Sequence, residues 1–401
     1  MGYFIIIIIG AISIIVPLIF KMKFDKDITY FEWLTCICVS IFISFVVYEL
    51  GSYNSFQDTE VLNTEVFSKK IIRKNCEYPG WYKSPDWFCT NVNTRSVVDH
   101  YETKYCTNSK GKSYSCGSSP VYRTEYSYDY PWEQKFYIYS PFKTFKVSRV
   151  DRQGAITPPR YLIVNVGDPV SITHSYQNYL LQADQSILSP KNISISKDEL
   201  SKIPDYPSTI YDMYKINRLI TIGMHVDNEK HWNEAISNVA KTVGPIKQAN
   251  PIVIITNEPP DIRYAIEKKW LGGKKNDVIV LIGVNKDKTI KWSDVITFMG
   301  NTGNEVFTRE LKNSINDLKV LDCDKLMVII KNTVLHKFDR KAMKSIEYLK
   351  DSFNPPMWVS ITSIICSLIV SIVASILAMK YDFFNQNFRR KLICRNSQRF
   401  F

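Results

Sequence analysis

Three long apolar stretches interrupt an otherwise mixed pattern of hydrophobic and polar residues. Tyr3–Phe20 has 18 residues and Met357–Met379 has 23, both without a charge, and Trp33–Tyr48 is a third apolar run that its flanks extend. A helix of about 20 apolar residues crosses the hydrocarbon core of a bilayer. The pattern therefore predicts three transmembrane helices: residues 3–20, 30–50 and 356–380.

The first stretch has two other interpretations, a cleaved signal peptide and a buried core helix. Only Gly2 and Tyr3 separate Met1 from the apolar run, so the basic segment of a signal peptide is missing. No pattern of small residues for cleavage follows Phe20. We therefore expect a retained membrane helix.

Basic residues flank the apolar stretches and predict their orientation. Lys21, Lys23 and Lys26 follow the first stretch, and Lys and Arg outnumber acidic residues after the third. Loops rich in Lys and Arg stay in the cytoplasm. We therefore predict an outer N-terminus, a short basic inner loop, an extracytoplasmic region over residues 51–355, and a basic cytoplasmic tail over residues 381–401.

Residues 51–190 alternate between aromatic and polar side chains. The stretch VYRTEYSYDYPWEQKFYIYSPF shows this at Tyr122, Tyr126 and Phe136, and TFKVSRVD and RYLIVNVGDPV continue it. Alternation with a period of two predicts β-strands with one buried face. An exposed aromatic binding face is the alternative to this packed, β-rich subdomain.

The pattern changes after a polar, proline-containing segment at residues 191–214, which is typical of a linker. Residues 215–353 alternate between short apolar strands and amphipathic helices, beginning with RLITIGMHV and a helix that Asp227 is expected to cap. TIKWSDVITF is expected to pair with DVIVLIGVN through the turn NKDK. The order predicts an α/β subdomain with a mixed sheet, and the whole chain is an α+β membrane protein.

Charge and motifs exclude several classes of function. The net charge of +12 is not concentrated in a long basic run, and no nucleic-acid-binding motif occurs. The predicted spans have no central charged residue of the kind that ion pathways use, so they are expected to act as anchors. Phosphate-loop, nucleophile-elbow, His-Glu-x-x-His and dinucleotide motifs are absent. A non-catalytic protein is therefore favoured, although an enzyme remains open.

Four cysteines lie close together in the β-rich region: Cys76, Cys89, Cys106 and Cys116. Gaps of 12, 16 and 9 residues leave no Cys-x-x-Cys pair, which disfavours a structural zinc site. Disulfides persist in extracytoplasmic compartments. Two disulfides are therefore expected; three pairings are open, and Cys76–Cys89 with Cys106–Cys116 is the first choice. Cys323 is expected to be a buried thiol.

A second cluster contains candidate metal ligands. HVDNEKHWNE brings His225, Asp227, His231 and Glu234 within ten residues, and the last two fall on one face of a helix. Such side chains could bind a divalent ion. The alternative is ordinary helix-start chemistry with surface histidines, and under it no cofactor is bound.

Polar residues also follow two of the predicted buried strands. They are Asn257, Glu258, Asp261, Asn285 and Asp287. Sites in open α/β sheets form beyond the carboxyl ends of the strands, so these groups could form a phosphatase-like or metal site. Turn and capping roles are the simpler explanation.

Two resemblances extend this interpretation. Residues 236–335, with the strand IVIIT, the helix IRYAIEKKWLGG and KKNDVIVLIGVNKDKTIKW after it, resemble a TPM domain, an α/β module of secreted or membrane-anchored proteins. DTEVLNTEVFSKK, the cysteine cluster and RVDRQGAITPPRYLIVNVGDPVSITHSYQNYL resemble uncharacterised membrane proteins of tailed bacteriophages, which implies a location in the host cytoplasmic membrane.

These observations together predict a membrane-anchored extracytoplasmic interaction protein. Its partners would be the lipid bilayer and an envelope or membrane protein, with no nucleic acid. A TPM-like metal-dependent hydrolase or metal-binding domain is the alternative.

Overall fold

The structure is a computed structural model that covers most of the chain. The residues it describes are 2–23, 29–75, 93–107, 113–127, 130–183, 186, 188–207, 209–211, 215–352 and 355–381. Cys76 and Cys89, with their predicted disulfide, lie outside these residues, as does nearly all of the predicted cytoplasmic tail.

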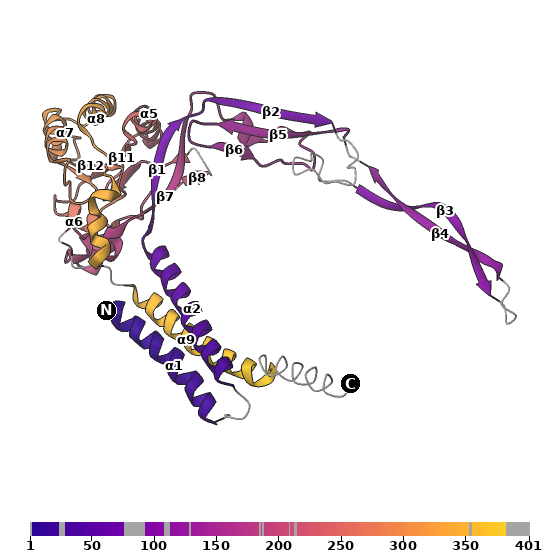
Figure 1. Cartoon of the computed structure of the whole chain (residues 1–401). Coiled ribbons are helices and arrows are strands. Elements are labelled where there is room, and N and C mark those ends of the chain that lie inside the picture. Colours follow the sequence, from indigo (N-terminus) through magenta and orange to yellow (C-terminus); the bar gives the residue numbers. More distant parts are fainter. Residues whose placement is uncertain are drawn as a thin grey trace.

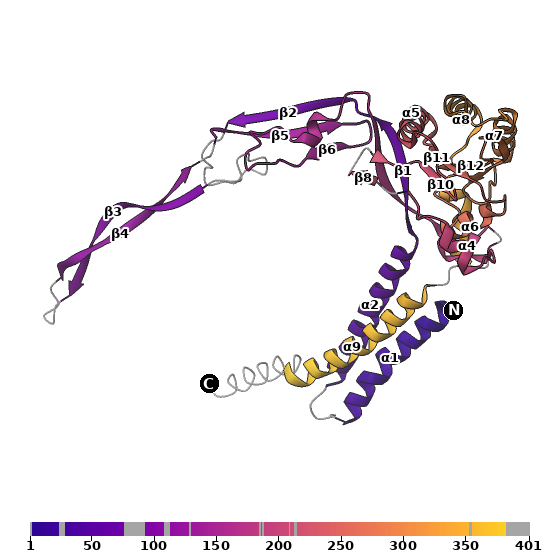
Figure 2. The ribbon, with the colours of Figure 1, turned by 180° about the vertical axis from the view of Figure 1, so that it is seen from behind.

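Three long helices correspond to the predicted spans. They are α1 (Gly2–Lys23), α2 (Tyr30–Ser55) and α9 (Met357–Tyr381). Each is long and apolar enough to cross a membrane. They pack against one another as a bundle (Figures 1 and 2). The chain is therefore a multi-pass membrane protein.

Serine side chains lie at the contacts inside this bundle. The hydroxyl oxygens of Ser13 in α1 and Ser367 in α9 are 3.0 Å apart, and both side chains are buried. Ser371 and Ser375 continue the buried line along α9, each donating to the carbonyl four residues earlier. Small residues allow membrane helices to approach closely, so this line accounts for the contact of α9 with α1.

A four-stranded sheet is the centre of the α/β unit. Its strands, in order across the sheet, are β10 (Leu219–Ile222), β11 (Asn250–Thr256), β12 (Asp277–Val284) and β13 (Ile290–Thr297). The first three are parallel, and β13 is antiparallel to β12. Every residue of β11 and β12 is buried, which explains their continuous apolar sequences. The predicted mixed sheet is confirmed.

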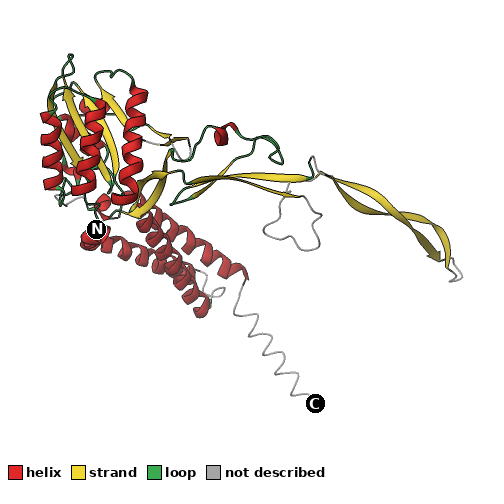
Figure 3. Ribbon diagram, turned by 90° about the horizontal axis from the view of Figure 1, so that it is seen from above, coloured by secondary structure: helices red, strands yellow, loops and turns green. Residues whose placement is uncertain are grey.

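Helices cover both faces of this sheet (Figure 3). The first face carries α5 (Glu229–Lys247), α7 (Glu305–Asp317) and α8 (Cys323–Lys337), and the second carries α4 (Lys197–Lys202) and α6 (Ile262–Lys269). Apolar residues on the inner sides of the helices, such as Ile236 and Leu326, are 0% exposed. The result is a three-layered α/β/α unit.

Helix α5 begins differently from the prediction. Its N-cap residue is Asn228, at φ 53°, and Asp227 instead places its carboxylate 2.8 Å from Nζ of Lys288. The prediction that Asp227 caps this helix was therefore wrong. Lys288 lies on the turn between β12 and β13, so this competing partner is a neighbour only in the folded chain.

A two-stranded ribbon connects the membrane bundle to the α/β unit. It pairs β1 (Gln57–Glu65) with β7 (Pro169–Gln177) in antiparallel register, and it packs against α5. Only Phe56 separates α2 from β1. The end of a membrane span is therefore continuous with a strand that lies on the α/β unit (Figure 1).

A small sheet follows this ribbon. Its strands are β2 (Ser68–Asn75), β5 (Trp132–Tyr139) and β6 (Thr144–Val147). The alternation predicted for β5 is confirmed, because Phe136 and Ile138 are 0% and 1% exposed. RYLIVNVGDPV, by contrast, is not a continuous strand: α3 (Pro159–Leu162) occupies its first part and β7 begins only at Pro169. Proline favours the first turn of a helix, which explains the difference.

The longest strands form an arm that projects away from the rest of the protein (Figures 1 and 2). Within the described residues, β3 (Asn93–Thr107) and β4 (Ser113–Ser127) pair only with each other. Strands of this length extend about 50 Å at about 3.3 Å per residue. A disulfide between Cys106 and Cys116, with Cα atoms 5.7 Å apart, joins them near the far end and confirms that predicted pair.

The remaining segments complete the α/β unit. The segment predicted as a linker includes α4 and Ile203, which is 2% exposed beneath α6. The 3₁₀ helix η3 (Met343–Ser352) has a kink at Ile346 and precedes α9. Short elements account for the rest: η1 (Tyr179–Gln182), η2 (Pro190–Asn192), β8 (Thr209–Tyr211) and β9 (Lys215–Ile216).

Candidate functional site

The polar residues at the carboxyl ends of the strands have local roles. Asn285 Nδ2 donates to Thr289 Oγ1 at 2.7 Å, and an Asp287 carboxylate oxygen lies 2.7 Å from the same hydroxyl, which fixes the β12–β13 turn. That bond lowers the pKa of Asp287. Glu258 lies 3.4 Å from Nζ of Lys202.

The other two predicted residues at this edge lie on the connection that follows β11. Asn257 packs so closely on Gly223, at φ +73°, that a Cβ there would lie 2.3 Å from Asn257 Oδ1. Asp261 stands at the N-cap position of α6 without a capping hydrogen bond. Turn and packing contacts thus account for most of the polar groups at this edge.

The four predicted metal ligands have different neighbours. Asp227 pairs with Lys288, Glu234 lies 3.9 Å from Lys230, and His225 lies 3.9 Å from Glu229. His231 turns toward α8, where its Nε2 lies 3.5 Å from Oδ1 of Asp324. Of the predicted set, His231 alone therefore joins a new group of donor atoms.

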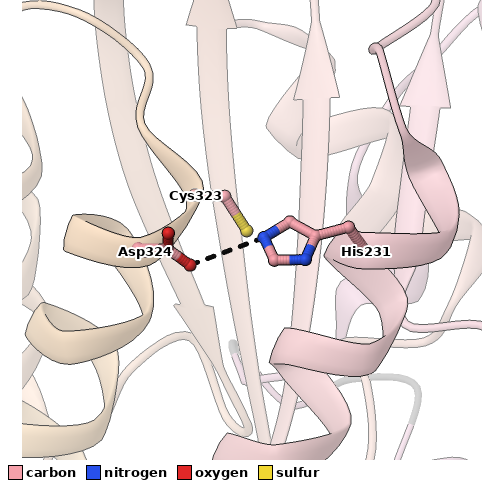
Figure 4. Close-up of side chains that lie close together, drawn as sticks. All are labelled: His231, Cys323 and Asp324. Carbon is pink, nitrogen blue, oxygen red and sulfur yellow. Dashed lines mark ion pairs between the residues drawn. The ribbon is translucent and has the colours of Figure 1, made fainter.

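That group consists of His231, Cys323 and Asp324 (Figure 4). Their nitrogen, sulfur and oxygen donor atoms all lie within 4.8 Å of one another, and no other described residues bring three such donors together. Cys323, expected as a buried thiol, is partly exposed. Burial raises the pKa of this thiol to about 11, with Asp324 and Asp322 adding to the effect.

A second polar assembly occurs where the β1–β7 ribbon meets the amino ends of the parallel strands. Arg218 directly precedes β10, Asn250 begins β11, and Asp277 begins β12. These three side chains are only 2%, 2% and 1% exposed. With their partners they form what we call the junction network: Asp58, Glu60, Asn63, Ser171, Tyr176, Tyr206, Arg218, Asn250, Lys274, Lys275, Asp277 and Arg340.

Arg218 connects the two strands of the ribbon to the sheet. Its guanidinium donates to Asn63 Oδ1 in β1 at 2.5 Å, to Ser171 Oγ in β7 at 3.0 Å, and to Asn250 Oδ1. Burial lowers the pKa of Arg218 to about 10. The side chain therefore remains charged at neutral pH.

Asp277 is the acidic centre of the network. Its carboxylate accepts from Asn250 Nδ2 at 2.8 Å, from Tyr206 Oη at 2.9 Å and from the backbone N–H of Lys274 at 2.7 Å. Burial raises the pKa of Asp277 to about 6 despite these donors. Burial likewise raises the pKa of Tyr206 well above its ordinary value.

Glu60 is another buried carboxylate of the network, at 0% exposure. It lies 2.5 Å from Nη2 of Arg340, 3.1 Å from Nζ of Lys275 and 2.9 Å from Nδ1 of His174. Burial alone would raise the pKa of Glu60. The hydrogen bonds and charges of Arg340 and Lys275 outweigh that effect and bring it below its ordinary value.

The junction network joins the β1–β7 ribbon to the sheet of the α/β unit. Its donors and acceptors are directed at one another across the contact between ribbon and sheet, so it fixes the α2–β1 connection on the α/β unit. No sequence motif marks this network, because its residues are far apart along the chain. The available signal was the polar first residue of two otherwise apolar strands, Asn250 and Asp277.

The arm presents a surface of a different kind. Tyr101, Tyr105 and Tyr122 are 64%, 73% and 61% exposed. The alternating pattern of the sequence therefore has two outcomes: a packed face in β5 and exposed aromatic side chains in the arm. Arg95 and Glu125, 2.9 Å apart, form an ion pair that links β3 to β4 near the body.

The fold defines the class of this chain as a multi-pass membrane protein with a mixed α+β extramembrane part and a disulfide in its β region. Comparisons with models of protein families, with curated proteins and with solved structures found no match.

Proposed function

We propose that this chain is a membrane-anchored interaction protein whose arm binds a protein of the cell envelope on the extracytoplasmic side. The observation that carries the proposal is the arm itself. It is a long two-stranded ribbon that exposes three tyrosines and pairs with no other described strand.

The physical chemistry of the arm supports a contact role. A two-stranded ribbon without a third strand or a covering helix is marginally stable in water, because it buries little apolar surface. Here the Cys106–Cys116 disulfide and the cross-strand ion pair of Arg95 with Glu125 support it instead. Tyrosine is enriched in protein interfaces, where its rigid ring gives contact area at a low cost in conformational entropy.

Two observations support the extracytoplasmic location. Disulfides persist in oxidising compartments, and one lies in the arm. The basic residues Lys21 and Lys23 end α1, on the side that the positive-inside rule assigns to the cytoplasm. The proposed site of action is the host cytoplasmic membrane, which the resemblance to phage membrane proteins implies, and the α/β unit would be a scaffold for the arm.

Site-specific photocrosslinking in intact cells tests the proposal. A photoreactive residue replaces Tyr101, Tyr105 or Tyr122 in separate full-length chains, and Tyr264, 49% exposed on α6, serves as the matched control. We expect one discrete product from the arm positions, identified by mass spectrometry as the same envelope protein, and no such product from Tyr264. Serine at the other two of these three tyrosines should remove it.

Other results would overturn the proposal. They are the absence of a discrete arm product, the same products from Tyr264, or a product that contains only two copies of this chain. A further variant replaces residues 93–127 with Asn-Gly, which is feasible because Asn93 and Ser127 are paired neighbours. It should retain the melting temperature of the body while losing the partner.

A further inference from the structure

Two helices bring three different metal-binding groups to one point on the surface of the α/β unit. His231 lies in the first turn of α5, and Cys323 and Asp324 are the first two residues of α8. Figure 4 shows the imidazole directed toward the carboxylate, with the thiol beside them. The donor atoms lie within 4.8 Å of one another.

The surrounding fold holds both helices in place. Trp232, next to His231, is 5% exposed, and Leu326, two residues beyond Asp324, is 0% exposed. Both belong to the core beneath α5 and α8. Asp322 caps α8 by accepting from the backbone N–H of Lys325 at 3.0 Å. The ligand-bearing turns are therefore fixed before any ion binds.

The donor set selects the metal. Imidazole with thiolate suits zinc and other borderline or soft ions, whereas calcium and magnesium take oxygen ligands. Zinc bonds of about 2.0–2.3 Å in a tetrahedron place the donor atoms about 3.3–3.7 Å apart. The 3.5 Å between His231 and Asp324 already meets this value. Rotation of exposed side chains suffices for the remainder.

We propose that His231, Cys323 and Asp324 bind a Zn²⁺ ion that links the first turns of α5 and α8, with a fourth position open to water. His231 is 48% and Asp324 83% exposed at the side chain, so an ion reaches the site from solvent. The ligands are Nε2 of His231, Sγ of Cys323 and a carboxylate oxygen of Asp324. This zinc site is independent of the arm and of its partner.

Cobalt substitution tests the site directly. Full-length protein in detergent is stripped with a chelator and titrated with Co²⁺, which gives a thiolate-to-cobalt charge-transfer absorption only if sulfur is a ligand. We expect this absorption with one ion per chain, displacement by Zn²⁺, and a higher melting temperature with Zn²⁺. Cys323→Ser should remove the absorption. His231→Ala and Asp324→Asn should each weaken binding by more than the about 10–100-fold typical of an outer-shell partner.

His225→Ala and Asp227→Asn are the matched controls, because both residues are exposed and lie just before α5. They should leave cobalt binding unchanged. Circular dichroism checks that Cys323→Ser remains folded, and Asp324→Asn gives a second test that leaves the thiol in place. The proposal is wrong if cobalt binds without charge-transfer absorption, if Cys323→Ser retains it, if the controls abolish binding, or if no ion binds.

Discussion

Arg218 places a charge among side chains that exclude water. Transfer of an ion from water to a protein interior is costly unless its hydrogen-bonding groups are satisfied. Here Asn63, Ser171 and Asn250 supply the acceptors, and they come from three different strands. The buried charge is therefore stable only when the ribbon is packed on the sheet, so Arg218 couples the folding of the two parts.

Substitution of this residue should be severe. Arg218→Met removes the donors and leaves buried acceptors unpaired, so we expect a loss of about 3–5 kcal/mol of folding free energy. Arg95→Met is the matched control, because its ion pair with Glu125 is exposed to solvent and should contribute little to stability. Thermal unfolding of both full-length variants in detergent measures the difference. Equal losses would contradict this account.

The buried carboxylates of Asp277 and Glu60 give opposite dependences of stability on pH. The pKa of Asp277 rises from 3.8 to about 6 on folding, so the folded state holds this proton more tightly. As the pH falls from 7 to 4, the wild-type chain gains about 2 kcal/mol of folding stability from Asp277 that Asp277→Asn lacks. The destabilisation caused by Asp277→Asn should therefore grow toward pH 4 in thermal melts.

Glu60 should behave in the reverse way. Its pKa in the folded state lies below the ordinary 4.5, so its contribution is complete above that pH and is lost as the pH falls through the folded value. The destabilisation caused by Glu60→Gln should therefore shrink on acidification. Thermal melts of the two variants in the same series of buffers check both directions. If the difference in melting temperature from the wild type changes in the same direction with pH for both variants, these pH dependences are wrong.

Among the elements, α5 packs closely on the backbone of β1 at Gly244. Gly244 in α5 faces the carbonyl of Asn63, and a Cβ there would lie 2.1 Å from that oxygen. The oxygen belongs to the backbone of a strand that the junction network holds, so it has little freedom to move. The absence of a side chain at Gly244 is therefore what allows the ribbon to lie on the helix.

Gly244→Ala should reverse the usual effect of alanine in a helix. Propensity alone favours alanine over glycine by about 1 kcal/mol, whereas the clash should cost about 1–3 kcal/mol or more. Gly10→Ala in α1, where no atom lies within 4 Å of the new Cβ, is the matched control and should be neutral or stabilising. The melting temperatures of both variants, compared with that of the wild type, measure the effect. A higher melting temperature for Gly244→Ala would contradict the close contact.

The elements that local patterns predicted are those whose signal lies within a few residues. Buried runs such as those of β11 and β12 and the long apolar spans needed no knowledge of the remainder of the fold. Asp227 was assigned wrongly because its partner, Lys288, lies 61 residues away. The metal prediction named His231 but not Cys323 or Asp324, because the packing of α5 on α8 is a tertiary contact that no local spacing reveals.

For the whole molecule, the arrangement of the three helices in the bundle determines which helix ends lie on the same side of the membrane. The N-terminal end of α1, the C-terminal end of α2 and the N-terminal end of α9 lie toward the α/β unit, and the opposite ends lie away from it (Figure 1). A membrane around the bundle therefore separates the α/β unit and the start of α1 from the C-terminal end of α9. In the orientation proposed above, the basic residues at the end of α1 lie on that far side, which would be the cytoplasm.

Protease protection of tagged chains tests this topology. In spheroplasts of a bacterium expressing the full-length chain, external protease should remove a tag before α1 and leave a tag after residue 401 intact, because only the first lies on the side of the α/β unit. Detergent should expose both tags, which controls for intrinsic resistance. Removal of the C-terminal tag alone would invert the orientation and place the arm and its disulfide in the cytoplasm. Equal protection of both tags would mean that one of the three helices does not cross the membrane, since an even number of crossings returns the chain to its starting side.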